Sequence, residues 1–467
     1  PDYAAAHNNL GLAQQALGRP HEAVECYRRS IAIKGDYAPS HNNLGIALGE
    51  IGNVQEAILS HRNALDLQPE SAEAYNSFGV TLQEVGKAEE AITIYQKALQ
   101  IKPDFAMAHN NLANSHRDLG NFEAAATAYQ KALQIEPDFA MAHHNLGLVL
   151  QDLDRLEEAA TSYQNGLRLV PDNPQGHLNL GHVFKRLAKY EEARESFRRA
   201  LSLVPPPSGA RTGLLECTYI VGDRDSFYKE LDQIIVDDPT NPGVAAITAF
   251  ASSQFDCPDP YPFCNSPMDF IHIKPLLFSE GKADGLLHTI CDEVFDLKLG
   301  GGNQSLLISG FQSAGTLFVE PHGSIATLEK MLRKEIAAYV VSHSKSDCLF
   351  IQEWPQEYVL KGWYILMEQG GYLKPHNHPT GWLSGVLYLK MPTEKGNEAN
   401  IEFGLHGNDF PILNHDYPRK TYQVTEGDLV LFPSSLFHRT IPFTNDEDRL
   451  CIAFDLEPVP DKVPAEG

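Results

Sequence analysis

The sequence has 467 residues, a formal net charge of −24 and a hydrophobic content of 43%. This length predicts two or three domains, and the hydrophobic content is typical of folded chains with apolar cores. The negative charge argues against a nucleic-acid-binding scaffold, because phosphate binding requires clustered cations. No apolar run approaches the roughly 20 residues that span a bilayer, so we expect no membrane partner.

The seven cysteines are scattered and show no paired spacing. This pattern favours a reducing compartment, and we expect a cytoplasmic protein without disulfides. The sequence begins at Pro1 inside a repeat, so we expect the natural chain to extend further at its N-terminus. The oligomeric state leaves no signature in the sequence.

Residues 1–207 repeat with a step of 34 residues. One position is always alanine, and another is aromatic in most repeats. These two series are Ala23, Ala57, Ala91, Ala125, Ala159 and Ala193, and Tyr27, His61, Tyr95, Tyr129, Tyr163 and Phe197. With Leu-Gly near the front and Pro at the end, this is the pattern of the tetratricopeptide repeat. The small alanine lets the two helices of a repeat approach closely, and proline ends the second helix.

The repeats set the expected domain limits. Six clear repeats occupy residues 4–207, a degenerate seventh occupies 208–241, and an apolar helix near Gly243–Ser252 caps the stack. We therefore predict a superhelix over residues 1–255 and a Pro-rich linker over 256–270. The second domain is predicted over residues 271–467.

Asparagine occupies one helix-A position in five of the six repeats. The column is Asn9, Asn43, Asn111, Asn145 and Asn179, with Ser77 in the third repeat. Carboxamides in a concave groove can grip a peptide backbone, since each offers a donor and an acceptor. The column resembles the asparagine ladder of the O-GlcNAc transferase repeats, which implies binding of an extended protein segment. The alternative is that these asparagines only solvate or cap the groove.

The second domain combines two helical patterns with several short strands. Helices are expected at Gly285–Phe295 and Gly323–His343, and strands are expected at Trp363–Met367, Leu383–Leu389, Asn400–Phe403, Asp428–Phe432 and Arg449–Asp455. Short strands separated by Gly, Pro and Asn turns predict a double-stranded β-helix, a jelly roll of the cupin type with supporting helices. The predicted fold class is therefore multidomain: an all-α superhelix followed by this β domain.

Three histidines form a candidate metal site. His376 and His378 lie two residues apart between two predicted strands, so their side chains are expected on the same side. His438 follows the strand Asp428–Phe432 about sixty residues later. A near pair and a distant histidine can supply three facial ligands and leave the other metal positions open, and we interpret this group as an iron site.

From about Trp363 to Leu456 the chain resembles the 2-oxoglutarate/Fe(II)-dependent oxygenases. The resemblance rests on Gly-Gly-Tyr-Leu-Lys-Pro-His-Asn-His-Pro at 370–379, Gly-Asp-Leu-Val-Leu-Phe-Pro at 427–433, His438 and Arg449. It implies Fe(II) and 2-oxoglutarate as cofactors, with ascorbate as a supporting reductant. It also implies that His376 and His438 ligate iron and that Arg449 binds the distal carboxylate of 2-oxoglutarate. Tyr364 and Tyr388 are further candidates for hydrogen bonding to the co-substrate.

His378 departs from the family pattern, because a carboxylate usually stands at this position. In the first interpretation His378 is itself a ligand and completes a three-histidine face. In the second, His376 and His438 hold iron with water or a carboxylate from another strand, such as Glu402. In the third, the domain has lost its metal and only binds other molecules.

These observations favour an oxygenase that hydroxylates a protein or peptide held in the repeat groove. The alternative is a non-catalytic interaction scaffold whose degenerate oxygenase domain binds a ligand or a metal. A third hypothesis is a three-histidine dioxygenase of the cupin type that does not use 2-oxoglutarate.

Overall fold

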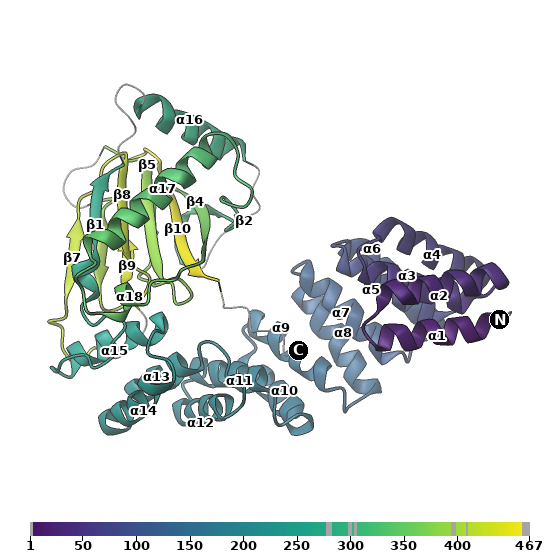
Figure 1. Ribbon diagram of the computed structural model, residues 1–467. Coiled ribbons are helices and arrows are strands. Elements are labelled where there is room, and N and C mark those ends of the chain that lie inside the picture. Colours follow the sequence, from purple (N-terminus) through teal and green to yellow (C-terminus); the bar gives the residue numbers. More distant parts are fainter. Residues whose placement is uncertain are drawn as a thin grey trace. The chain divides into compact units, whose positions relative to one another are not determined.

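The computed structural model describes residues 3–276, 283–297, 301–302, 306–393, 398–407 and 410–459. The chain divides into two compact units, Pro1–Ala210 and Arg211–Gly467. The first is all helical and the second combines helices with antiparallel strands (Figure 1), which confirms the predicted fold class. No helix in the described ranges is both long and apolar enough to cross a bilayer. All seven cysteines are free.

The first unit is built from antiparallel helix pairs, one pair for each predicted repeat. Its helices are α1 (Ala4–Ala16), α2 (Pro20–Ile33), α3 (Ala38–Glu50), α4 (Val54–Leu67), α5 (Ala72–Glu84), α6 (Ala88–Ile101), α7 (Ala106–Asp118), α8 (Phe122–Ile135), α9 (Ala140–Asp152), α10 (Leu156–Leu169), α11 (Pro174–Arg186) and α12 (Tyr190–Leu201). The alanine series of the second helices is completely buried, as close helix packing requires.

The glycine of the Leu-Gly pair explains how the two helices of a repeat fit together. A β-carbon added to Gly11 would lie 2.4 Å from Cε1 of Tyr27, and one added to Gly79 would lie 2.4 Å from Cε1 of Tyr95. The ring of the second helix therefore rests directly on the backbone of the first. Because a larger side chain would separate the helices, the glycine and the aromatic series act together.

The second unit contains two groups of helices and two sheets. Its elements are α13 (Ala210–Ile220), α14 (Arg224–Asp237), α15 (Pro242–Gln254), η1 (Pro267–Phe270), β1 (His272–Pro275), α16 (Ala283–Asp296), β2 (Gly301–Gly302), β3 (Leu307–Ser313), α17 (Gly323–Ser342), α18 (Leu349–Gln352), β4 (Tyr358–Leu373), β5 (Leu383–Lys390), β6 (Ile401–Gly404), β7 (Arg419–Tyr422), β8 (Asp428–Pro433), β9 (Phe437–Thr440) and β10 (Arg449–Pro458). The two predicted helices, found as α16 and α17, and the five predicted strands are all confirmed.

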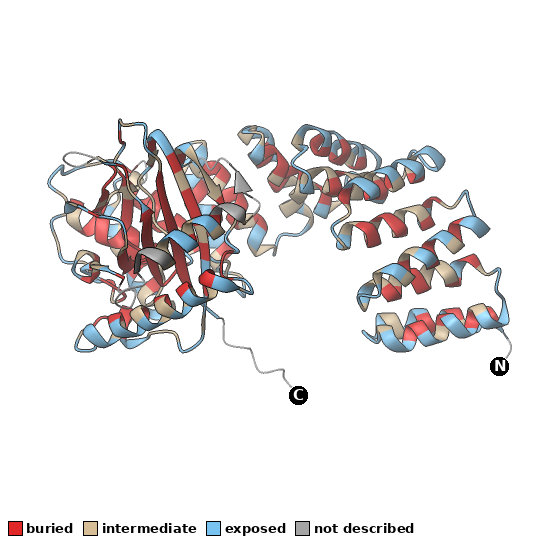
Figure 2. Ribbon diagram, turned by 90° about the horizontal axis from the view of Figure 1, so that it is seen from above, coloured by how far each residue is buried: buried red, intermediate tan, exposed pale blue. Residues whose placement is uncertain are grey.

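The larger sheet has the order β1-β8-β5-β10-β4-β3-β2, and the smaller has the order β7-β6-β9. Neighbouring strands are antiparallel. The central strands are buried on both faces (Figure 2), because Leu328, Leu332 and Ile336 of α17 belong to the same apolar core as β5 and β10. Two antiparallel sheets with helices supporting the larger one agree with the predicted jelly roll.

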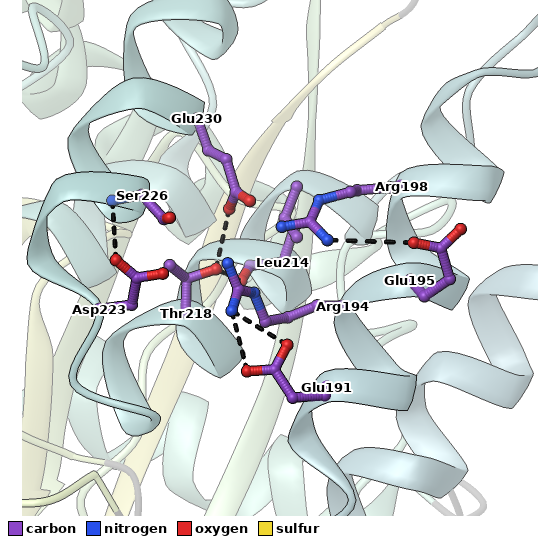
Figure 3. A network of polar contacts seen from close by, with 9 residues as sticks. All are labelled: Glu191, Arg194, Glu195, Arg198, Leu214, Thr218, Asp223, Ser226 and Glu230. Atoms are coloured by element: carbon purple, nitrogen blue, oxygen red, sulfur yellow. Dashed lines mark hydrogen bonds and ion pairs between the residues drawn. The ribbon is translucent and has the colours of Figure 1, made fainter.

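Helices α13 and α14 lie where the degenerate seventh repeat is expected, and α15 lies where the capping helix is expected. Between α13 and α14, Thr218 Oγ1 donates a hydrogen bond to Glu230 (2.8 Å), and Asp223 caps α14 by accepting one from the Ser226 N–H (3.0 Å; Figure 3). Gln254 of α15 binds the connection between β6 and β7. By their contacts α13 to α15 belong to the second unit, whereas the sequence assigned them to the superhelix.

Candidate metal centre

The three histidines converge on one point from two segments. His376 and His378 lie in the turn that follows β4, and His438 lies on β9. The backbones of His376 and His438 pair directly, through N–H to O=C hydrogen bonds of 3.0 and 2.9 Å. Their ring centroids are 4.3 Å apart, and each is 5.2 Å from that of His378. One nitrogen from each ring lies within 4.8 Å of the others, a spacing at which one cation can contact all three.

Hydrogen bonds fix the orientation of each ring. The Nδ1 of His376 is 2.8 Å from the Lys374 carbonyl oxygen, and that of His438 is 3.3 Å from the Leu436 carbonyl oxygen. Because a carbonyl only accepts, each Nδ1 carries the proton and each Nε2 keeps a free lone pair. The Nε2 of His378 is buried and has no partner in the described part of the chain. This is the tautomer that a metal ligand needs.

The surroundings of His376 and His438 favour the uncharged imidazole. Burial, reinforced by the neighbouring His378, lowers the pKa of His376 to about 4. The same causes hold the pKa of His438 well below its usual range. Neutral imidazole is the form that binds metal, and it is well suited to Fe(II).

A cavity of about 290 Å³ extends from the histidines to Arg449 on β10. Arg449 is 1% exposed, and its Nη1 lies 3.5 Å from the sulfur of Met367 and 3.7 Å from that of Cys451. Its Nε has no partner, and no carboxylate of the described residues forms an ion pair with it. An unpaired buried guanidinium is costly, so this wall of the cavity is built for an anion.

Tyr388 on β5 completes this anionic end of the cavity. Its ring centroid is 5.0 Å from the guanidinium carbon of Arg449, and its buried hydroxyl has no partner among the described residues. Burial raises the pKa of Tyr388 far above its ordinary value, so the phenol stays neutral and can donate a hydrogen bond. The three imidazoles, the guanidinium and the phenol together fit a metal ion with a dicarboxylate beside it.

Two kinds of family model match the chain. Residues 361–455 match the family described as "Putative 2OG-Fe(II) oxygenase". Residues 84–116 and 113–154 match "TPR repeat", and residues 2–70 and 138–205 match "Tetratricopeptide repeat". The chain is a tetratricopeptide-repeat protein with a 2OG-Fe(II) oxygenase domain. The more specific likeness to the O-GlcNAc transferase repeats stays a prediction.

A search of curated proteins finds no match. Several solved structures resemble the chain, including the pilF protein of Pseudomonas aeruginosa, with 22% identity, a TM-score of 0.38 and coverage of 45% of this chain and 96% of that one. PilW, a type IV pilus biogenesis factor, has 18% identity, a TM-score of 0.42 and coverage of 45% and 98%. MamA from Desulfovibrio magneticus RS-1 has 22% identity, a TM-score of 0.33 and coverage of 36% and 95%. Likeness at this level carries no argument about function.

The oxygenase domain places the two candidate tyrosines differently. Tyr388 lines the cavity. On β4 the cavity is lined by Trp363 and Ile365, the two neighbours of Tyr364. Tyr364 therefore lies on the opposite face of β4, where its ring centroid is 5.7 Å from that of Phe311. The strand position gives Tyr364 a packing role in the core.

Three residues of the oxygenase cavity were not among the predicted site residues. Trp363 stacks on His378 with 5.7 Å between ring centroids and 12° between planes. Asp455 accepts a hydrogen bond from His378 Nδ1 (2.6 Å) and another from Ser384 Oγ (2.6 Å). Asp455 could have been found from the sequence, because strand alternation places it on the same face as Arg449.

Glu402 lies apart from the histidines of the oxygenase domain. Its side chain on β6 accepts a hydrogen bond from Arg439 Nε at 2.7 Å. In the described residues, the group with metal-ligand spacing consists of His376, His378 and His438 alone. The geometry therefore favours a three-histidine face over a carboxylate supplied by Glu402.

The asparagines of the repeat array take part in contacts between repeats. Asn43 donates to Asn8 Oδ1 (3.0 Å), and Asn111 donates to Asn76 Oδ1 (3.0 Å). Asn145 donates to Asn114 Oδ1 of the preceding repeat (3.3 Å), whereas Asn179 accepts from Gln175 of its own helix (2.8 Å) and Asn9 is exposed. Part of the amide capacity of the column thus links neighbouring repeats, and peptide binding by these residues stays a prediction.

Proposed function

We propose that the chain is a 2-oxoglutarate- and Fe(II)-dependent oxygenase that hydroxylates a protein or peptide substrate. The observation that carries the proposal is the buried, unpaired Arg449 in the same cavity as the three histidines. A metal site alone would be compatible with many reactions. A guanidinium in the same cavity as the metal ligands favours a dicarboxylate co-substrate, because one carboxylate can bind the metal while the other pairs with Arg449.

Each residue of the site has a distinct task in this function. His376, His378 and His438 would hold Fe(II), and Arg449 with Tyr388 would bind the distal carboxylate of 2-oxoglutarate. With both groups bound, O₂ converts a substrate C–H to C–OH while 2-oxoglutarate becomes succinate and CO₂. The apolar cavity walls, including Trp363 and Phe454, limit the access of water to the site. The role of ascorbate finds no support in the site.

The repeat array favours a protein or peptide as the substrate. Tetratricopeptide repeats form extended concave surfaces that suit chain segments better than small metabolites. Asn9, exposed in the first repeat, and the Oδ1 atoms of Asn43 and Asn145, whose Nδ2 groups make the bonds between repeats, can contact a peptide backbone. A small-molecule oxygenase would gain nothing from six such repeats.

The second candidate function is an interaction scaffold with an oxygenase domain that no longer turns over. His378 favours it, because three neutral ligands give the metal no negative charge from the protein's own ligand atoms. In this case the purified chain would bind peptides but would not hold stoichiometric Fe(II). Metal analysis therefore separates the two functions before any substrate is known.

The test is succinate release from 2-oxoglutarate in the presence of Fe(II) and cell extract. We expect turnover by the wild-type chain and at least a hundredfold loss in His438→Ala. His322→Ala removes an exposed histidine of the same unit and should keep full turnover, which controls for surface effects. Wild-type chain that neither binds Fe(II) nor releases succinate would overturn the proposal and leave the scaffold.

A further inference from the structure

His378 differs from the other two histidines in the group that holds its ring. His376 and His438 donate their Nδ1 protons to neutral backbone carbonyls. His378 Nδ1 instead lies 2.6 Å from the carboxylate of Asp455 on β10. The unusual ligand of the oxygenase domain is therefore the one with an anionic partner.

The Asp455 carboxylate is held firmly inside the protein. Its residue is 6% exposed, and its second oxygen accepts a hydrogen bond from Ser384 Oγ at 2.6 Å. Ser384 Oγ is in turn 2.8 Å from Ser434 Oγ, and the Ser434 carbonyl accepts from the His378 N–H at 2.9 Å. This closed network fixes both the carboxylate and the segment that carries His378.

Asp455 is the acidic side chain among the described residues that line the cavity. A set of two histidines and a carboxylate gives the metal one negative charge, whereas three imidazoles give none. A carboxylate that accepts the Nδ1 proton of a ligating histidine increases the electron density at Nε2 and fixes the ring orientation. The cavity thus contains a negative charge, that of the Asp455 carboxylate, which would lie behind the ligand His378 and not on the metal itself.

We propose that Asp455 is a positioning residue that supplies, through His378, the negative charge that a direct carboxylate ligand would provide. The inference rests on the proposed function, since it takes the three histidines as iron ligands. It explains how a three-histidine face can hold Fe(II) before 2-oxoglutarate adds its own charge. It also assigns a role to a residue outside the family's expected ligand set.

Two substitutions of Asp455 separate the effect of its negative charge from the effect of its hydrogen bond to His378. Asp455→Asn keeps an oxygen that can accept the Nδ1 proton but removes the charge, whereas Asp455→Ala removes both. Asp446→Asn removes a charge from an exposed residue and serves as the matched control. Binding of Co(II) without 2-oxoglutarate is measured by calorimetry, and the absorption bands of bound Co(II) report the ligand set.

We expect Asp455→Asn to weaken Co(II) binding about ten- to hundredfold while the bands at saturation stay as in the wild type. The loss should shrink when 2-oxoglutarate is present, and Asp446→Asn should bind as tightly as the wild type. Wild-type affinity in Asp455→Asn, or altered bands at saturation, would overturn the role of charge. Wild-type chain that binds no Co(II) would instead count against the metal centre of the proposed function.

Discussion

Arg449 is the residue whose surroundings indicate most clearly what kind of ligand the cavity would bind. Its guanidinium is buried beside sulfur atoms and the Tyr388 ring, and the nearby acidic residues lie elsewhere, with Asp448 3.9 Å from Lys390. A surface ion pair, the simplest alternative reading of the sequence, is therefore not formed. A carboxylate in the cavity would give this residue a partner of matching geometry.

Replacing Arg449 by methionine tests this reading through co-substrate choice. The side chain keeps its apolar length, so the cavity should persist, but the distal carboxylate loses its partner. We expect the KM for 2-oxoglutarate to rise at least tenfold, while 2-oxopentanoate, which lacks that carboxylate, gains relative to it. Steady-state succinate and butyrate release measure the ratio, and an unchanged preference would show that Arg449 does not bind the co-substrate.

His61 is a second residue whose surroundings predict a measurable property. It replaces the buried tyrosine or phenylalanine of the other repeats, and its ring nitrogens lie 3.2 Å from Asn42 Oδ1 and 3.0 Å from Thr81 Oγ1. Burial lowers the pKa of His61 to about 4. Since the unfolded pKa of about 6.5 is higher, the unfolded chain binds the extra proton as the pH falls.

The stability of this repeat should therefore be complete above pH 6.5 and fall between pH 6.5 and 4, by on the order of 3 kcal/mol. His61→Phe removes the titrating group and should flatten this dependence. Amide hydrogen exchange in α4 at pH 7 and pH 5 measures it, corrected for the intrinsic exchange rate. His21→Phe changes an exposed histidine and should leave the dependence intact; equal acid sensitivity in both variants would contradict the assignment to His61.

At the scale of elements, the strands around the histidines were predictable from the sequence. Which side chains of each strand face the cavity and which face the core was only partly predictable. The apolar runs marked β5, β8 and β10, and alternation placed Arg449 correctly on an inward face. On β4 both faces are buried, one against the cavity and one against the core, so the run from Trp363 to Met367 carries no alternation. Tyr364 could therefore not be separated from Trp363 by sequence alone, and the pairing of Asp455 with His378 depends on a register between distant segments.

The connection between β6 and β7 is an element held mainly by helices. Gln254 at the end of α15 accepts hydrogen bonds from the N–H groups of Leu413 (2.7 Å) and Asn414 (2.9 Å) and donates to the Asn414 carbonyl (3.0 Å). The Tyr219 hydroxyl donates to the Pro411 carbonyl at 2.6 Å. These bonds replace the strand pairing that this irregular segment lacks.

Gln254→Ala should destabilise the second unit by about 2 kcal/mol, since three hydrogen bonds to a part-buried segment are lost. Amide exchange at Leu413 and Asn414 should become faster, while β10 stays protected. Gln233→Ala on the exposed face of α14 is the matched control and should change neither measurement. Unaltered protection of both amides in Gln254→Ala would mean that other contacts hold the segment.

At the scale of the whole molecule, the repeat period determined the architecture of the first unit completely. Each 34-residue step became a helix pair, and in five of the six a glycine of the first helix lies against the ring of the second, with Ala113 in its place in the fourth. The histidines beside the asparagine column took a role that the sequence left open: His41, His109, His143 and His177 each hold the backbone carbonyl six residues before them, at 2.8–3.0 Å. They fasten the turn between repeats, a function that depends on three-dimensional contact.

The asparagine column gives the prediction that concerns both units. Replacing Asn111, Asn145 and Asn179 by alanine should weaken binding of a protein substrate at least tenfold and leave uncoupled 2-oxoglutarate turnover unchanged. Asn76→Ala removes the same bond between repeats as Asn111→Ala but spares the column, so it controls for stability. Pull-down and succinate assays on the same samples measure substrate binding and turnover. An equal loss of both would mean that these asparagines only stabilise the repeats.

Helices α13 to α15 resemble repeats in sequence but support the oxygenase domain through Gln254 and Tyr219. A chain cut at residue 271 would leave the 405–418 segment without those bonds and would expose Phe410, whose ring packs on Phe250. We therefore expect the smallest stable fragment that carries the oxygenase domain to begin near residue 211. Any exchange of catalytic modules between repeat arrays, by recombination or in the laboratory, has to carry these three helices along.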